Sequence, residues 1–211
     1  MNKLKNITAL LFTAALFHGF MHHSFATSPP QEPANDTTAV ELSFADERLI
    51  ELFVSNVRQG NFEWALSIYD EIEYKDVLDL QSAYMRALER TGQHEGILEK
   101  YEERLKKWPD HKPFYEGALF HRARHKYTRA ENRYQAEMRK YHQNENATTY
   151  ALLRRELRNL SEDFRQVRDM ALELREMNPR DRRYLLLLRN SYQRLNEPEK
   201  AEEINRMLEQ N

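Results

Sequence analysis

Apolar residues recur every three or four positions from Asp46 to the end of the chain, with polar residues between them. This is the period of an amphipathic α-helix that turns one apolar side toward a core. Short breaks divide the pattern, and the clearest lies at Gly60, with Phe62 and Ala65 opening the next periodic segment. A glycine between two such segments folds two helices into an antiparallel pair. The pattern therefore predicts an all-α chain of helical hairpins.

The same kind of break recurs further along the chain. Three residues take the equivalent turn position: Gly60, Gly92 and Asn196. Five residues after each turn comes a small or apolar residue: Ala65, Ile97 and Ala201. A residue of this kind lets the second helix cross close to the first, because no bulky polar side chain holds the backbones apart. The recurrence indicates a repeated structural unit.

These segments resemble tetratricopeptide repeats, which are helix-turn-helix units of about 34 residues that end near a proline. The first unit matches the repeat pattern at Leu49, Leu52, Phe53, Gly60, Phe62, Ala65, Tyr69 and Ile72. Pro109 and Pro179 stand where the family has its closing proline. The resemblance implies a right-handed α-solenoid of four to five hairpins over residues 46–211. The units are 46–77, 78–110, 111–145, 146–181 and 182–211.

Two interpretations are open for the middle of the chain, where the repeat pattern is weakest. In the first, residues 146–181 form a degenerate repeat with its turn at Leu160 to Asp163. In the second, one long helix runs from about Thr148 to Met177 and pairs with a long helix from about Pro113 to Tyr141. We favour the first interpretation, since Ser161 followed by acidic residues is a plausible helix start.

The first 26 residues have the features of a secretory signal. Lys3 and Lys5 precede a mostly apolar run, and Ser24 and Ala26 supply the small residues for cleavage after Ala26. Residues 27–45 are polar and contain prolines, which predicts a flexible linker. We expect a periplasmic or secreted protein with no stable membrane span; the alternative is an uncleaved signal that serves as an anchor.

Composition narrows the classes of function. The 32 basic and 34 acidic side chains give a net charge of −2, which does not favour nucleic acid as a partner. Without cysteine there is no disulfide, thiolate metal site or thiol nucleophile. We expect no cofactor, because the chain has no phosphate-binding glycine loop and only five glycines.

No residue pattern indicates catalysis. His121 and His125 share a helix face, but Arg122 stands where a zinc hydrolase has its glutamate, so we assign no metal site. Basic residues between 122 and 158 alternate with acids and with tyrosines at seven-residue spacing, which is typical of a packed helix with a mixed-charge surface. A basic patch for an acidic protein or an anionic envelope surface remains open.

The resemblance also implies where a partner binds, since the first helices of successive repeats line a concave groove. Carrying those positions over gives eight candidate residues: Arg58, Arg86, Arg90, Tyr115, Leu119, Arg122, Asn190 and Arg194. Several are arginines, which can hold a carboxylate in bidentate fashion. The function expected is a non-catalytic scaffold or adaptor that docks a protein or peptide of the cell envelope. The alternatives are an assembly subunit that acts through its convex face or self-association and, less favoured, a metal-dependent enzyme.

Overall fold

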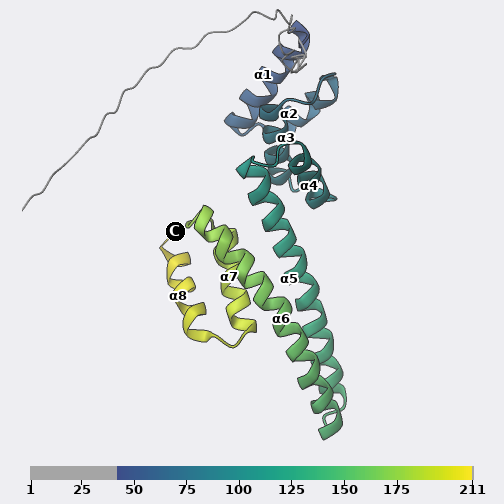
Figure 1. Ribbon diagram of the computed structural model, residues 1–211, viewed down its shortest axis with the longest axis vertical. Coiled ribbons are helices and arrows are strands. Elements are labelled where there is room, and N and C mark those ends of the chain that lie inside the picture. The colour runs from purple at the N-terminus through teal and green to yellow at the C-terminus, as the bar shows by residue number, and fades with distance from the viewer. Residues whose placement is uncertain (1–41, 211) are drawn as a thin grey trace, which may run out of the picture. The chain divides into compact units, whose positions relative to one another are not determined.

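The computed structural model describes residues 42–210, so the predicted signal at 1–26 and most of the linker at 27–45 lie outside the described residues. The described residues form helices and no strand (Figure 1). The helices are α1 Phe44–Gln59, α2 Phe62–Ile68, α3 Leu78–Arg90, α4 Ile97–Lys107, α5 Lys112–Gln143, α6 Ala147–Met177, α7 Arg182–Arg194 and α8 Pro198–Glu209. A short 3-10 helix, η1 Tyr69–Glu71, follows α2. Within residues 42–210, no helix combines the length and apolar character needed to cross a bilayer.

The three aligned breaks have the same local geometry. Gly60, Gly92 and Asn196 all have positive φ, at 88°, 74° and 58°. In each turn the next residue donates its N–H to a carbonyl five residues back: Asn61 to Asn56, Gln93 to Leu88 and Glu197 to Tyr192, each at 2.9 Å. This bond is the signature of the Schellman cap, which ends a helix and reverses the chain. The predicted equivalence of the three turns is therefore confirmed.

The crossing positions after these turns lie in the core. Ala65, Ile97 and Ala201 are 0%, 4% and 4% exposed. The helices that flank the first and last of these turns pack as hairpins, α1 against α2 and α7 against α8. The side chains of α3 and α4 meet in one apolar cluster that also includes Phe114 of α5. Residue spacing thus identified the first and last hairpins, and it placed the second turn at Gly92.

The preferred interpretation of residues 146–181 is wrong. α5 and α6 are each continuous and pack along one another, so the described residues have one long hairpin where two repeats were expected. The buried stripe Leu160, Phe164, Val167, Ala171 and Leu174 runs unbroken through the expected turn. Ser161 does not cap a new helix, because its hydroxyl donates to the carbonyl of Leu157 at 2.8 Å, as it does inside a helix.

The actual reversal lies at residues 144–146. Asn146 accepts hydrogen bonds from the N–H groups of Thr148 and Thr149, while the Thr149 hydroxyl accepts from the N–H of Asn146. This reciprocal capping box starts α6. An asparagine with a threonine three residues on was therefore the helix-start signal in this region, and no glycine or proline follows it until Pro179.

α4 and α5 approach each other closely at Gly117. A Cβ added to Gly117 would lie 2.2 Å from the ring of Tyr101, far inside van der Waals contact. Tyr101 is itself only 5% exposed and packs with Met85 and Phe114. Glycine is required here for space, since its φ is not in the left-handed region.

We predict that Gly117→Ala lowers the free energy of unfolding by about 1–3 kcal/mol, because the added methyl group displaces the Tyr101 ring in a filled core. Urea denaturation followed by circular dichroism measures the change. In a Tyr101→Ala background the same substitution should cost much less, since the ring is gone. Equal costs in the two backgrounds would show that Tyr101 is not the source of the constraint.

Candidate functional site

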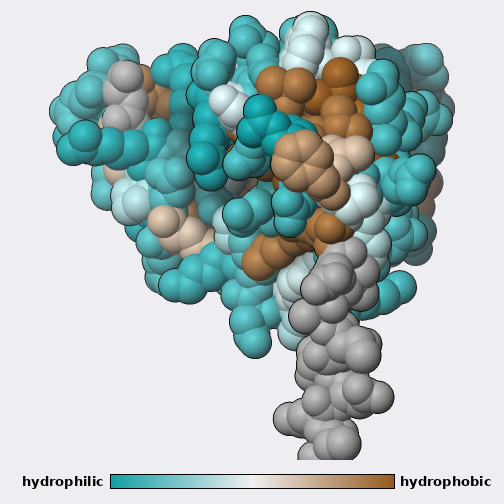
Figure 2. Space-filling view, turned by 90° about the horizontal axis from the view of Figure 1, so that it is seen from above, coloured by the Kyte–Doolittle hydropathy of each residue, from teal (hydrophilic) through white to brown (hydrophobic). Residues whose placement is uncertain are grey.

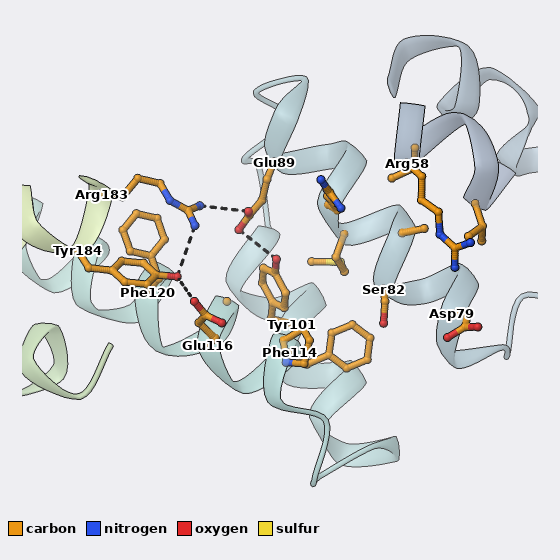
Figure 3. Close-up of a pocket in the computed structure, with 17 residues that line it drawn as sticks. Arg58, Asp79, Ser82, Glu89, Tyr101, Phe114, Glu116, Phe120, Arg183 and Tyr184 are labelled. Carbon is orange, nitrogen blue, oxygen red and sulfur yellow. Dashed lines mark hydrogen bonds and ion pairs between the residues drawn. The ribbon is translucent and has the colours of Figure 1, made fainter. Parts of the chain in front are cut away.

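A cavity of about 390 Å³ lies between α1, α3, α5 and α7, and we name it the central hollow (Figure 3). Its apolar wall includes Val57 of α1, Met85 of α3, and Phe114 and Phe120 of α5. These side chains are almost fully buried, so they form a fixed floor. Polar groups line the two ends of the hollow.

Two further hollows adjoin the central one. The first, of about 670 Å³, follows α1 and shares Val54, Arg58 and Asp79 with the central hollow. The second, of about 430 Å³, lies between α5 and α7 and shares Glu89, Phe120 and Arg183 with it. Because each neighbouring pair has side chains in common, the three hollows form one groove along α1, α3, α5 and α7. We call it the groove below.

Glu89 of α3 is the centre of a polar network at one end of the central hollow. One of its oxygens, Oε1, accepts the Tyr101 hydroxyl at 3.0 Å and lies 2.9 Å from His121 Nε2. The other, Oε2, accepts from the Arg183 guanidinium at 3.2 Å (Figure 3). Burial by itself would raise the pKa of Glu89, but these hydrogen bonds and the charge of Arg183 outweigh it and hold the pKa below its ordinary value.

Arg183 and Tyr184 attach the start of α7 to this network. The guanidinium of Arg183 is 4.9 Å from the Phe120 ring centroid and also pairs with Asp181 at 2.8 Å. The Tyr184 hydroxyl donates to Glu116 Oε1 at 2.7 Å. Burial, with the adjacent carboxylate of Glu116, raises the pKa of Tyr184, so the hydroxyl keeps its proton and remains a donor. α7 is thereby tied to both α3 and α5.

Two cations that line the central hollow have no partner among residues 42–210. Arg58 and Arg86 line the hollow, are exposed, and make no hydrogen bond or ion pair with another residue of 42–210. Arg58 and Asp79 lie at the end away from Arg183 (Figure 3). The central hollow therefore combines an apolar floor with two accessible guanidinium groups, which is a suitable arrangement for an apolar side chain next to a carboxylate.

The structure brings together some of the eight residues predicted to bind a partner. Arg58 and Arg86 line the central hollow, and Asn190 lines the hollow between α5 and α7. Arg90 is exposed at the end of α3 but does not line the central hollow. Of the positions carried over from the family pattern, one on α1, one on α3 and one on α7 therefore line the groove.

The other four candidates lie elsewhere. Leu119 is 5% exposed and packs in the core with Leu174 and Tyr184, so it is not a surface residue. Tyr115 donates to Glu173 of α6 at 2.7 Å, and Arg122 pairs with Glu102 of α4 at 2.7 Å. Arg194 is held by Glu131 at 2.5 Å and lies over the ring of Tyr134.

The α5 residues that do line the central hollow differ from those expected: they are Pro113, Phe114, Glu116, Gly117 and Phe120. The expected positions assumed a turn inside residues 111–145, and α5 has none, so the helix presents a different side. Arg183 and Tyr184 were also missed. The N-cap residue Asp181 marks the start of α7, but no local pattern indicates that Arg183 reaches Glu89, 94 positions earlier.

The two histidines considered for a metal site have different surroundings. His121 is 6% exposed and lies between the rings of Tyr101 and Phe120, with Nε2 at Glu89. His125 is exposed one turn further along α5. Over residues 42–210, no three or more histidine and carboxylate side chains are grouped so that they could hold a metal ion. His121 has a packing role and a role in the Glu89 network.

We predict that Glu89→Gln destabilises the fold by about 1–3 kcal/mol at neutral pH, because it weakens the bonds to Arg183, Tyr101 and His121 at once. The folded-state pKa of Glu89 lies below the ordinary 4.5. The ionised carboxylate therefore makes its full contribution to the free energy of unfolding above pH 4.5, and this contribution is lost as the pH falls through the folded-state pKa. Unfolding free energies measured from pH 7 to pH 3 should therefore fall less steeply for the variant.

The exposed ion pair of Arg122 and Glu102 supplies the control. Glu102→Gln removes a carboxylate of the same kind, but from a solvated pair that contributes little. It should leave both the stability and its pH profile close to those of the unaltered chain. A Glu89→Gln profile that cannot be distinguished from that of Glu102→Gln would contradict a central role for Glu89.

Comparisons with known proteins find only distant matches among solved structures. A scan of protein families finds no match, and neither does a search of curated proteins. Among solved structures, MamA AMB-1 is 15% identical with a TM-score of 0.44, over 80% of this chain and 99% of that one. MamA MSR-1 is also 15% identical, with a TM-score of 0.45 and the same coverage. Such values assign the chain to no family, and the all-helical architecture of residues 42–210 is established by the helices themselves.

Proposed function

We propose that this chain is a non-catalytic interaction scaffold or adaptor that docks an extended peptide or helix of a partner protein in the groove. The hairpins would stack as tetratricopeptide-like repeats in a right-handed solenoid, as their shared turns and the sequence resemblance suggest. A groove lined by four helices from four different hairpins supports this function, because a binding surface of that kind is the usual product of stacked hairpins.

One observation carries the proposal: Arg58 and Arg86 face the hollow without a partner, above a buried apolar floor. Arg183, the third arginine of the central hollow, has its carboxylates, whereas Arg58 and Arg86 are available to a ligand. A peptide that places a carboxylate at Arg58 and Arg86 and an apolar side chain near Phe114 would match both features. Binding would then combine charge-assisted hydrogen bonds with apolar burial.

Export belongs to the same proposal. The basic start, apolar run and small residues of 1–26 support a cleaved signal, and residues 27–45 would then tether the helical part. The partner would be a protein or peptide of the bacterial cell envelope or its surroundings. N-terminal sequencing of the mature protein, with Thr27 expected first, distinguishes this from a retained anchor.

An assembly subunit that acts by self-association is the second candidate, and an apolar surface supports it. Viewed from above, apolar side chains gather on the surface (Figure 2). Phe44 is 78% exposed and Leu52 is 44% exposed, both on α1. Exposed apolar area at the first hairpin of a stack is a position where a second copy could continue the packing.

We predict that Arg58→Glu combined with Arg86→Glu weakens partner binding about ten-fold or more, because each change replaces a favourable cation by a repelling carboxylate. Crosslinking in the envelope followed by pull-down identifies the partner, and titration of the purified pair measures the dissociation constant. Lys106→Glu combined with Arg206→Glu is the matched control, since both side chains are exposed outside the groove and the change in net charge is equal.

Three results separate the candidates. Loss of binding in the groove variant alone supports groove docking. Equal binding by both variants would show that the partner uses another surface. A partner that proves to be a second copy of the chain, lost on Phe44→Ser with Leu52→Ser, would favour the assembly subunit over the scaffold.

A further inference from the structure

The free end of the long hairpin stands apart from the groove. We call residues 135–158 the hairpin end; they comprise the last part of α5, the turn and the first part of α6. The apolar cluster that joins this hairpin to Leu195 extends as far as Tyr134 on α5 and Leu157 on α6. Beyond it the two helices run past α7 and α8 (Figure 1). The groove lies elsewhere, with Thr128 as the last α5 residue that lines it.

Charge on the hairpin end is unbalanced. The hairpin end contains five basic residues, Arg139, Lys140, Arg154, Arg155 and Arg158, and three acids, Glu137, Glu145 and Glu156. Each of these acids has a partner: Glu137 pairs with Lys140, Glu145 with His142, and Glu156 with Arg133. Arg139, Arg154, Arg155 and Arg158 are exposed and form no ion pair with any residue between 42 and 210.

Apolar groups flank these arginines on α6. Leu153 and Leu160 are buried and define the inner side of the helix. Arg154, Arg155 and Arg158 occupy the opposite side, by their spacing along the helix. Tyr150 and Leu152 border this cationic stripe and are 50% and 49% exposed. The Arg154 guanidinium lies 6.0 Å from the Tyr150 ring centroid, so it covers the ring without a carboxylate partner.

From these features we propose that the hairpin end binds the surface of an anionic lipid bilayer. Arginines in a stripe match a surface of many phosphate groups, because each guanidinium reaches a phosphate through a long apolar stem. Tyrosine and leucine beside the stripe suit the boundary between headgroups and acyl chains. An acidic protein would also attract the charges. However, the helix pair projects from the rest of the helices and has an exposed tyrosine on one side of the stripe and an exposed leucine on the other. This arrangement fits the broad, flat surface of a bilayer better than it fits a single acidic protein.

Co-sedimentation with vesicles tests the proposal on the full chain. The probes are vesicles of phosphatidylglycerol mixed with phosphatidylcholine, and vesicles of phosphatidylcholine alone. Binding should be about ten-fold stronger to the anionic vesicles and should weaken as salt is raised. The affinity for the anionic vesicles should fall about ten-fold in a triple variant that combines Arg154→Glu, Arg155→Glu and Arg158→Glu. The apolar run near the N-terminus is common to all variants, so it contributes an equal background.

A matched control has the same change in net charge. Lys106, Lys112 and Arg206 are exposed and lie on α4, α5 and α8, away from the hairpin end, so their joint replacement by glutamate should leave vesicle binding unchanged. Circular dichroism should show both triple variants folded, since every altered side chain is exposed. Tyr150→Ser should reduce the part of the binding that persists at high salt.

Several outcomes would overturn the proposal. Equal binding to neutral and anionic vesicles would show that charge does not drive the contact. Equal losses in the two triple variants would show that only net charge matters. An acidic protein whose capture depends on Arg154, Arg155 and Arg158 while vesicle binding does not would make the hairpin end a protein contact and the bilayer proposal wrong.

Discussion

The carboxylate of Glu89 is the interaction on which the arrangement of the groove depends. It belongs to α3 and contacts Tyr101 of α4, His121 of α5 and Arg183 of α7. Four helices from three hairpins therefore meet at one partly buried charge. A carboxylate that is largely removed from water is stabilised in its ionised form by such partners, because its desolvation is unfavourable without them. The same bonds that satisfy Glu89 fix the walls of the central hollow, so the site and the fold share one set of contacts.

How far the sequence predicts this structure depends on the range of the interactions involved. The turns at Gly60, Gly92 and Asn196 follow from local backbone requirements, and short patterns reveal them. Arg58 and Arg86 could be placed in the groove because each lies only a few residues before such a turn. The α5 residues of the central hollow could not be predicted in this way. When a helix continues past its expected end, no nearby turn in the sequence indicates which of its sides faces the groove. Arg183 is a long-range contact that spacing does not encode.

The long hairpin shows how a repeated pattern can be extended without losing the packing of its neighbours. α5 begins as the first helix of a repeat would, with Phe114 and Gly117 packed toward α3 and α4. α6 ends as a second helix would, with Leu174 packed against Tyr184 of α7. Beyond the cluster that includes Tyr134, Leu157 and Leu195, the two helices run past α7 and α8. The hairpin end adds a surface on which basic side chains outnumber acidic ones.

The ion pair between Glu89 and Arg183 also has a consequence for the order in which the chain becomes structured. Hairpins joined by short turns form from contacts close in sequence, which are made quickly. Residues 94 positions apart meet only after the intervening helices have packed. During synthesis the first two hairpins emerge well before Arg183, so Glu89 is without its cation until α7 docks. The central hollow is therefore complete only after α7 has docked on α3 and α5.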